Sequence, residues 1–363
     1  MNESASLAAP VSWDSDAFNA RVRAVLDDFL DQQATRLEPL GDDAARLVAE
    51  ARTCVSGGKR FRAAFCYWGF RAISPHVADD DALVRACAAL ELLHASALVH
   101  DDLMDSSDTR RGRPASHRAF EAEHRQTGWT GDPSQYGAAA AILLGDLLLG
   151  WAGDLLRHCG LPRAEVDAGL TVFEHCRTEV IAGQFLDVSV QARAHADAEL
   201  AMTVLRYKSA KYSIERPLEI GAALAGATSE QSRELTRFGL PLGEAFQLRD
   251  DLLGVFGDPA VTGKPAGDDL VEGKRTVLVA HALEAATTAD ATHLDSSLGR
   301  PLDDAAIAEL RRIIHVSGAP AQVEELIDSL ADTALVALAG ADIDEHARSV
   351  LAQLASAATR RTV

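Results

Sequence analysis

The sequence is poor in aromatic residues, in lysine and in positive charge. Aromatic residues make up 5% of its 363 residues, so we expect a core of small aliphatic side chains. Lys and Arg number 35 against 54 Asp and Glu, which gives a formal net charge of −19. This balance argues against a nucleic-acid-binding protein, because such a protein needs basic groups to neutralise phosphates. It argues equally against adsorption to anionic lipid.

Three further absences bear on the expected location of the protein in the cell. The five cysteines form no CxxC pair and no zinc-site spacing, so we expect reduced, buried thiols. The longest apolar stretch, residues 138–156, contains Asp146 and Asp154, whereas a membrane span needs about 20 residues with almost no charge. We therefore expect a buried helix here, with Asp146 as a buried structural acid or arginine partner. The N-terminus has no basic segment typical of a signal peptide, so the sequence predicts a cytoplasmic protein without a membrane span.

Apolar residues recur at intervals of three and four along nearly the whole chain, which is the period of amphipathic helices. The predicted helices cover roughly 43–54, 60–74, 80–104, 113–125, 136–158, 163–187, 197–225, 229–256, 273–286, 303–316 and 320–356. No segment alternates as a strand does, and residues 287–301 are predicted to form a surface loop. The expected fold class is all-α, a single-domain bundle of about ten or more long helices around a central cavity. Residues 13–356 form this domain, between a disordered tail at 1–12 and a frayed tail at 357–363.

Adjacent aspartates occur twice inside apolar helical sequence. Asp101 and Asp105 are one helical turn apart on one face, with Asp102 beside them. Asp250 and Asp251 form the second cluster, in which the fifth position is glycine. Buried like charges cost several kcal/mol unless they are neutralised, and a hard divalent cation neutralises carboxylates without Cys or His ligands. The two clusters therefore predict Mg²⁺ or Mn²⁺ sites.

Basic residues complete a predicted diphosphate site. Of only five lysines in the chain, four lie in short polar or glycine-containing motifs. These four are Lys59, Lys208, Lys264 and Lys274. Lysine and arginine bind phosphate oxygens, and metal held by carboxylates binds them too. No nucleotide-binding glycine loop is present, so the sequence favours a metal–diphosphate site over a nucleotide site.

The ordered set of motifs resembles the trans-isoprenyl diphosphate synthase (polyprenyl synthetase) family, and most closely its geranylgeranyl diphosphate synthases. The motifs are GGKRFR, LLHASALVHDDLMDSSDTRRGRP, KSA, GQFLD, FQLRDDLLGVFGDP, TGKPAGDD and EGKRT. The resemblance implies the isoprenoid synthase fold, a homodimer, and Mg²⁺ with Mn²⁺ as a substitute. The implied metal ligands are Asp101, Asp102, Asp105, Asp250 and Asp251. Gly254 stands where the family has a further acid, and Asp268 matches another acid near that site.

The resemblance divides the other site residues between two substrates. The implied allylic diphosphate-binding residues are Arg110, Lys208, Gln247, Lys264 and Lys274. The implied isopentenyl diphosphate-binding residues are Lys59, Arg62, His94 and Arg111. Gln184 and Asp187 match a GQxxD motif whose glutamine lines the reaction centre. The residues implied to be catalytic are Asp101, Asp102, Asp105, Lys208, Asp250, Asp251 and Gln184.

The implied reaction is a condensation of isopentenyl diphosphate with dimethylallyl, geranyl or farnesyl diphosphate. The allylic C–O bond ionises, the isopentenyl double bond attacks the cation, and a proton leaves. Family members that stop at farnesyl diphosphate carry bulky aromatics just before the first aspartate, where this chain has Ser96 and Ala97. We therefore expect geranylgeranyl diphosphate, with Leu93 as part of the tunnel floor, and keep a longer all-trans polyprenyl product as an alternative.

Two alternatives belong to other classes. A class I terpene cyclase also uses a DDxxD motif with Mg²⁺, but it does not need a second diphosphate pocket such as Lys59, Arg62 and His94. A non-catalytic subunit of a heteromeric synthase tends to lose an aspartate motif, and here both remain apart from Gly254. Incorporation of labelled isopentenyl diphosphate distinguishes the three classes.

Overall fold

The structure is a computed structural model that describes residues 13–195, 197–257 and 267–360. Regular structure in these ranges is almost entirely helical, which confirms the predicted all-α class. Helices α4 (Asp80–Met104) and α10 (Ser229–Phe256) have the predicted bounds. Each begins at a residue whose side chain accepts a hydrogen bond from the first turn, Asp79 for α4 and Thr228 for α10.

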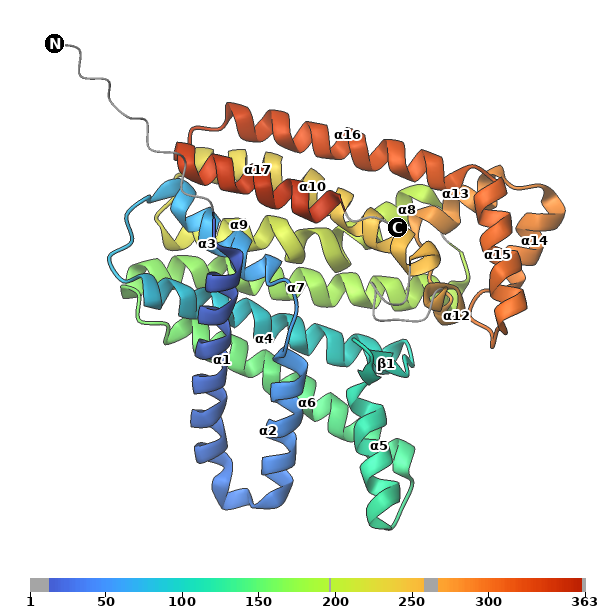
Figure 1. Cartoon of the computed structure of the whole chain (residues 1–363), viewed down its shortest axis with the longest axis horizontal. Coiled ribbons are helices and arrows are strands. Elements are labelled where there is room, and N and C mark those ends of the chain that lie inside the picture. Colours follow the sequence, from blue (N-terminus) through green and yellow to red (C-terminus); the bar gives the residue numbers. More distant parts are fainter. Residues whose placement is uncertain (1–12, 196, 258–266, 361–363) are drawn as a thin grey trace.

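The central helices run side by side across the body of the molecule (Figure 1). The α1–α2 pair and α5 project from one side, α16 and α17 lie along the other, and α13 to α15 form one end. The other helices are α1 (Ser15–Leu37), η1 (Glu38–Leu40), α2 (Asp42–Val55), α3 (Phe61–Ile73), α5 (Ser116–Thr127), α6 (Pro133–Arg157), α7 (Arg163–Arg193), α8 (Ala198–Leu205), η2 (Arg206–Glu215), α9 (Arg216–Leu224), α12 (Asp268–Glu272), α13 (Val277–Ala285), α14 (Thr288–Ser297), α15 (Asp304–Val316), α16 (Ala319–Gly340) and α17 (Glu345–Thr359).

Two apolar clusters hold this arrangement together. The larger one joins α1, α3, α4, α6, α7, α9 and the first half of α10, and includes the fully buried rings of Phe65, Phe173 and Phe238. The smaller one joins α8, α13, α15 and the far half of α10, around Leu248 and Leu278. Burying this aliphatic surface is the main source of stability. It also fixes α4, α7, η2 and α10 as rigid supports for the side chains between them.

Several predicted elements differ from the structure. The single helix expected over 197–225 is divided, because η2 is a π-helix of ten residues between α8 and α9. The helix expected over 320–356 is two helices, which break near Ala341. The loop expected at 287–301 is wrong, since α14 occupies most of it. Only Leu294 of α14 is buried, so the segment has no strong apolar period to reveal it.

The ends of the helical body and one turn also differ from prediction. Residues 357–359 do not fray, because α17 continues to Thr359, whose carbonyl accepts a hydrogen bond from Arg249 Nε at 3.1 Å. The expected tail at 1–12 lies outside the described residues. A short antiparallel hairpin, β1 (Thr109–Arg110) and β2 (Arg113–Pro114), contradicts the expectation of no strands. Its turn has positive φ at Arg111 and Gly112.

Within the described ranges, two helices are long and apolar enough to cross a membrane by length and composition alone, namely α4 and α6. In α4, 78% of the apolar window is buried inside the protein, as expected for a core helix. In α6 only 44% of the window is buried, and Ile142 and Leu143 are exposed. The prediction of a buried helix at 138–156 therefore holds for only part of α6.

Candidate active site

A cavity of about 1300 Å³ opens between α3, α4, α7, η2 and α10. The predicted site residues that line it are Lys59, Arg62, Leu93, His94, Ser96, Ala97, Asp101, Arg110, Arg111, Gln184, Lys208, Gln247, Asp250, Asp251 and Lys274. These residues are widely separated in sequence, and the fold brings them to one space. Asp102 and Asp105 are buried behind this lining. Lys264 lies outside the described residues.

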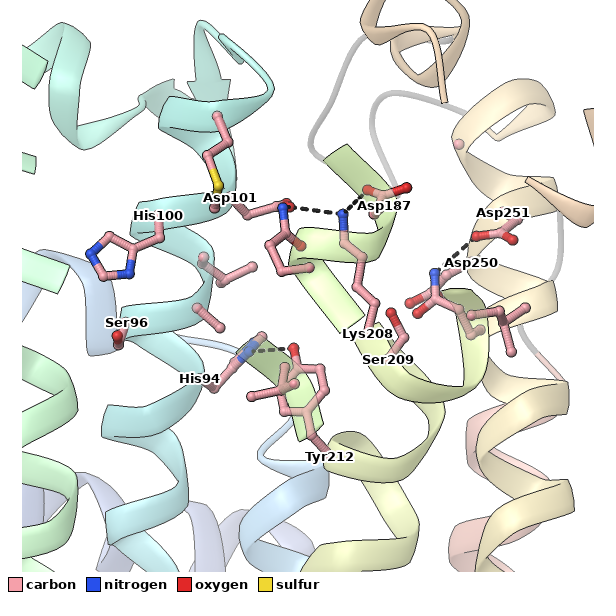
Figure 2. Close-up of a pocket in the computed structure, with 18 of the residues that line it drawn as sticks. His94, Ser96, His100, Asp101, Asp187, Lys208, Ser209, Tyr212, Asp250 and Asp251 are labelled. Carbon is pink, nitrogen blue, oxygen red and sulfur yellow. Dashed lines mark hydrogen bonds and ion pairs between the residues drawn. The ribbon is translucent and has the colours of Figure 1, made fainter. Parts of the chain in front are cut away.

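Lys208 projects from the π-helix into the cavity and lies between two carboxylates (Figure 2). Its Nζ is 3.0 Å from Asp101 Oδ1 and 2.6 Å from Asp187 Oδ2. Gln184 Nε2 also donates to Asp101 Oδ1, at 3.0 Å. Burial alone raises the pKa of Asp101, but Lys208, Lys274 and Arg110 outweigh burial and hold that pKa below its usual value. Asp101 is therefore an anion at neutral pH.

The other two acids of the first cluster have different environments. Arg110 Nε donates to Asp102 Oδ1 at 2.9 Å, so Asp102 is held by the hairpin that follows α4. Asp105 ends α4, and neither of its carboxylate oxygens accepts a hydrogen bond from a described residue. Lys274 Nζ lies 3.3 Å from Asp105 Oδ2. Burial and the neighbouring Asp101 raise the pKa of Asp105 to about 6.

The second cluster lies on α10, across the cavity from Asp101 (Figure 2). Gln247 Nε2 donates to Asp251 Oδ1 at 2.9 Å. Burial raises the pKa of Asp251 to about 7, and the charges of Asp269 and Asp250 add to that rise. Burial is the larger cause of the raised pKa of both Asp105 and Asp251, and neighbouring carboxylates add to it, so a bound cation would favour the charged form of each acid.

The donor set fits magnesium. The cavity has carboxylates on two facing helices, and Asp105 has two buried oxygens without a hydrogen bond from any described residue. Mg²⁺ takes oxygen ligands and keeps several of its waters, so it binds through one or two carboxylates together with substrate phosphates. Among the described residues, no three His, Cys, Asp or Glu side chains converge to hold an ion by themselves. The arrangement therefore suits a metal that is shared with a diphosphate.

A second basic region lies deeper along α3 and α4. The guanidinium of Arg62 lies 4.3 Å from the ring centroid of Tyr212, and its Nη2 donates to Ser213 Oγ at 2.7 Å. The Tyr212 hydroxyl shares a 3.2 Å hydrogen bond with His94 Nδ1 (Figure 2). Burial, then the charges of Arg62 and Arg111, hold the pKa of His94 well below its usual value, so this ring is neutral.

The loop before α3 is held in an unusual backbone conformation. Arg60 has φ 54°, a left-handed value that is uncommon outside glycine, and it follows two glycines with positive φ. Its side chain is buried, pairs with Glu91 at 2.8 Å and donates to the carbonyl of Val55 at 2.5 Å. These contacts fix the segment that carries Lys59 and Arg62 at the cavity wall.

The polyprenyl synthetase family model matches residues 45–315. The chain belongs to the polyprenyl synthetase family. It is 32% identical to the short chain isoprenyl diphosphate synthase of Methanothermobacter thermautotrophicus, over 75% of this chain and 77% of that protein. It is 33% identical to the geranylgeranyl diphosphate synthase of Methanosarcina mazei, over 73% of this chain and 74% of that protein.

A solved structure of the family agrees closely with this one. The geranylgeranyl pyrophosphate synthase of Corynebacterium glutamicum, solved with isoprenyl diphosphate and magnesium, is 42% identical. The TM-score is 0.94, and the match covers 96% of this chain and 100% of that chain. These findings confirm the all-α isoprenoid synthase fold and make this polyprenyl synthetase a trans-prenyltransferase.

The apolar end of the polyprenyl synthetase cavity lies along α4 and α6. Leu93, Ser96 and Ala97 line it, and Figure 2 shows Ser96 on the side of α4 away from Lys208. The prediction for Asp146 is wrong, because its side chain is 64% exposed and its partner is His100, at 3.7 Å, instead of an arginine. Asp146 therefore lies on an exposed side of α6. The apolar residues around it in the sequence gave no indication of this exposure.

Sequence reasoning missed three residues at this site. Tyr212 stands four residues after Lys208, and that spacing could have placed it on the same side of a helix. Asp269 lies beside Asp268, and its carboxylate contacts Lys274 at 3.3 Å. Glu272 Oε2 lies 2.5 Å from Lys274 Nζ. The only sequence signal for this contact is that the two residues are close together in the EGKRT motif.

Proposed function

We propose that the chain condenses isopentenyl diphosphate with an allylic diphosphate in the presence of Mg²⁺ and releases geranylgeranyl diphosphate. One observation carries this proposal. Asp101 on α4 lies across one cavity from Asp250 and Asp251 on α10, and basic residues line the cavity both near these acids and deeper along α3 and α4. A prenyltransferase needs two diphosphate sites in one water-poor space. The magnesium and isoprenyl diphosphate in the related corynebacterial structure support the same assignment.

The allylic diphosphate lies near the mouth of the cavity in this proposal. Lys208, Arg110 and Lys274 bind it, with Gln247 close to the second cluster. Asp101, Asp102, Asp105, Asp250 and Asp251 would hold Mg²⁺, which would neutralise the diphosphate and make it a better leaving group. Lys208 and Arg110 stabilise the negative charge that develops as the C–O bond breaks. Lys264 belongs to the same proposed group but lies outside the described residues.

Isopentenyl diphosphate binds beside the allylic substrate. Lys59, Arg62 and Arg111 hold its diphosphate, and neutral His94 adds a polar contact without adding charge. This places the isopentenyl double bond next to the allylic cation and makes the attack effectively intramolecular. The walls exclude water, which would otherwise convert the cation to an alcohol. Gln184 lines the reaction centre, and the released diphosphate accepts the proton.

The growing chain extends along α4, beneath the diphosphates. One helical turn spans about 5.4 Å, close to the length of one isoprene unit. Ser96 and Ala97 leave room in the first turn below Asp101, so growth continues beyond farnesyl diphosphate. Leu93, one turn further down, forms part of the floor in this proposal.

The protein acts as a homodimer of a single cytoplasmic domain, residues 13–356, in this proposal. A cluster of large apolar side chains on α6 and α7 supports it, because a contiguous exposed apolar face is typical of a subunit interface. Its members are Ile142, Leu143, Ile181, Phe185 and Val188, and all of them except Leu143 also line the open side of the cavity. A membrane span has almost no charged residues. Asp146, an exposed acid on α6, therefore favours a protein partner for this face over lipid.

Incorporation of labelled isopentenyl diphosphate tests the proposal. The purified protein is incubated with each allylic primer, with Mg²⁺ and after chelation by EDTA. Mg²⁺-dependent incorporation supports the synthase. Release of diphosphate from an allylic substrate without incorporation would identify a cyclase instead. A folded protein that is inert alone and active only with a second chain would be a non-catalytic subunit.

A further inference from the structure

Arg249 joins three helices beside the second pair of aspartates. It lies on α10 directly before Asp250, and its side chain is largely buried. Its two terminal nitrogens both donate to the carboxylate of Glu324 on α16, with Nη2 2.6 Å from Oε2. Its Nε donates to the carbonyl of Thr359, in the last turn of α17, at 3.1 Å. All three nitrogens of this guanidinium therefore bind groups on other helices.

A guanidinium suits these contacts better than an ammonium group does. It is planar and presents paired N–H donors that match a carboxylate, with a further N–H at a fixed angle to them. The last carbonyls of a helix have no partner within that helix, and a cation near them is favourable. Glu324 thus holds the guanidinium in place while its Nε satisfies the carbonyl of Thr359. The end of α17 is thereby fixed to both α10 and α16.

The end of α17 is part of the cavity wall. Ala357, in the same last turn as Thr359, lines the cavity, and so does Arg360 directly after that turn. α17 packs on α3 and α10, and these two helices contribute Phe61 and Phe246 to the cavity lining. The terminal turns of helices open at low free energy. The part of the wall that α17 forms therefore depends on the group that holds its last turn.

We propose that Arg249 is a positioning residue, which holds the last turn of α17 against α10 and so keeps water out of the cavity during condensation. This inference rests on the proposed function, because the species that needs protection is the allylic cation. Water that reaches the cation adds through its oxygen, loses a proton and gives a prenyl alcohol. Diphosphate is then released, but no isopentenyl unit is joined. Arg249 itself touches neither substrate in this proposal.

The share of allylic substrate that becomes prenyl alcohol tests this role. Arg249→Leu removes the contacts with Glu324 and Thr359, and we expect the alcohol share to rise about threefold to tenfold. Arg249→Lys keeps the charge without the paired donors, so a smaller rise is expected. Arg233→Leu, at an exposed arginine of the same helix that pairs with Glu230, is the matched control and is expected to behave as wild type does. The alcohol is extracted before any dephosphorylation of the products.

Hydrogen exchange locates the effect in the folded protein without substrate. In Arg249→Leu, the amides in the last turn of α17 are expected to exchange about tenfold faster than in wild type. Mn²⁺ binding in the presence of inorganic diphosphate is expected to stay unchanged, because Arg249 holds α16 and α17. Thermal unfolding shows whether each variant folds. If Arg249→Leu does not fold, Glu324→Ala removes the paired contact from its partly exposed side and is expected to raise both the alcohol share and the exchange rate.

The role of Arg249 is overturned if Arg249→Leu gives the same alcohol share as Arg233→Leu, or if the last turn of α17 exchanges as it does in wild type. A loss of Mn²⁺ affinity in Arg249→Leu would also overturn it, because the residue would then act on the metal site. Failure of the proposed function has a different result. In that case wild type neither incorporates isopentenyl diphosphate nor releases diphosphate from an allylic substrate. If wild type does incorporate it and Arg249→Leu forms no extra alcohol, only the role of Arg249 fails.

Discussion

The guanidinium of Arg62 lies over the ring of Tyr212, with 4.3 Å between the guanidinium carbon and the ring centroid. The same tyrosine shares a hydrogen bond with His94, at 3.2 Å. One aromatic side chain therefore positions two of the residues that we assign to isopentenyl diphosphate. This contact joins η2 to α3 and α4 at the depth where the second substrate binds in our proposal.

Removing the Tyr212 hydroxyl tests this role. Tyr212→Phe keeps the ring beneath Arg62 but loses the hydrogen bond to His94, so we expect the KM for isopentenyl diphosphate to rise about threefold to tenfold. The KM for the allylic primer is expected to stay unchanged. Steady-state kinetics with each substrate varied in turn measure both. Tyr207→Phe, at a residue of the same helix that is 37% exposed, is the control. Equal effects of the two variants would refute the prediction.

A bulky side chain at position 97 is expected to shorten the product. Ala97 lines the cavity one turn before Asp101, so Ala97→Phe fills the space through which the chain extends. We expect farnesyl diphosphate to become the main product, and Ala97→Val to give a mixture. Products are sized by chromatography after removal of the diphosphate. An unchanged product distribution in a folded Ala97→Phe protein would show that the tunnel runs elsewhere.

Metal binding is expected to release protons and to weaken at low pH. The pKa of Asp105 is raised to about 6 and that of Asp251 to about 7, so in the metal-free protein both acids hold protons below those pH values. Mg²⁺ binds the carboxylate and must displace these protons. Apparent Mg²⁺ affinity in the presence of diphosphate should therefore fall between about pH 8 and about pH 5.5.

Titration calorimetry in buffers of different ionisation enthalpy measures this proton release directly. We expect more protons to be released per bound metal at the acid end of the range than at the alkaline end. An affinity that does not change with pH, with no proton release, would contradict the raised pKa values.

The exposed face of α6 and α7 is expected to join two copies of the chain. Leu143 is 62% exposed on α6, so Leu143→Asp places a charge in that face and should convert dimers to monomers. Val336→Asp changes a similarly exposed residue, 75% exposed, on α16 and should leave the dimer intact. Sedimentation velocity distinguishes the two states. A wild-type protein that sediments as a monomer would contradict the proposed dimer.

Local sequence signals predicted the long central helices well. The bounds of α4 and α10 follow from the apolar period, which is a property of nearby residues. The aspartates of the two clusters were predicted to bind metal, because adjacent aspartates are unusual inside apolar helical sequence. The helix α14 was missed because burial of Leu294 alone leaves almost no period to detect.

Features that depend on distant segments could not be predicted. The environment of Asp269 depends on Gly254, which lies on another helix, and no local pattern relates the two. The contact of Arg60 with Glu91 spans α3 and α4, and its left-handed backbone has no signal in the sequence GGKRFR. Asp146 was predicted to be buried because its neighbours are apolar, but that face of α6 is exposed within the chain.

Product analysis of the purified wild-type protein is the most direct test of the proposed synthase activity. The reaction contains isopentenyl diphosphate, Mg²⁺ and one of the three allylic primers, and its products are sized after dephosphorylation. We expect geranylgeranyl diphosphate from each primer and no product when EDTA removes the metal. A folded protein that forms no prenyl product with any primer would contradict it.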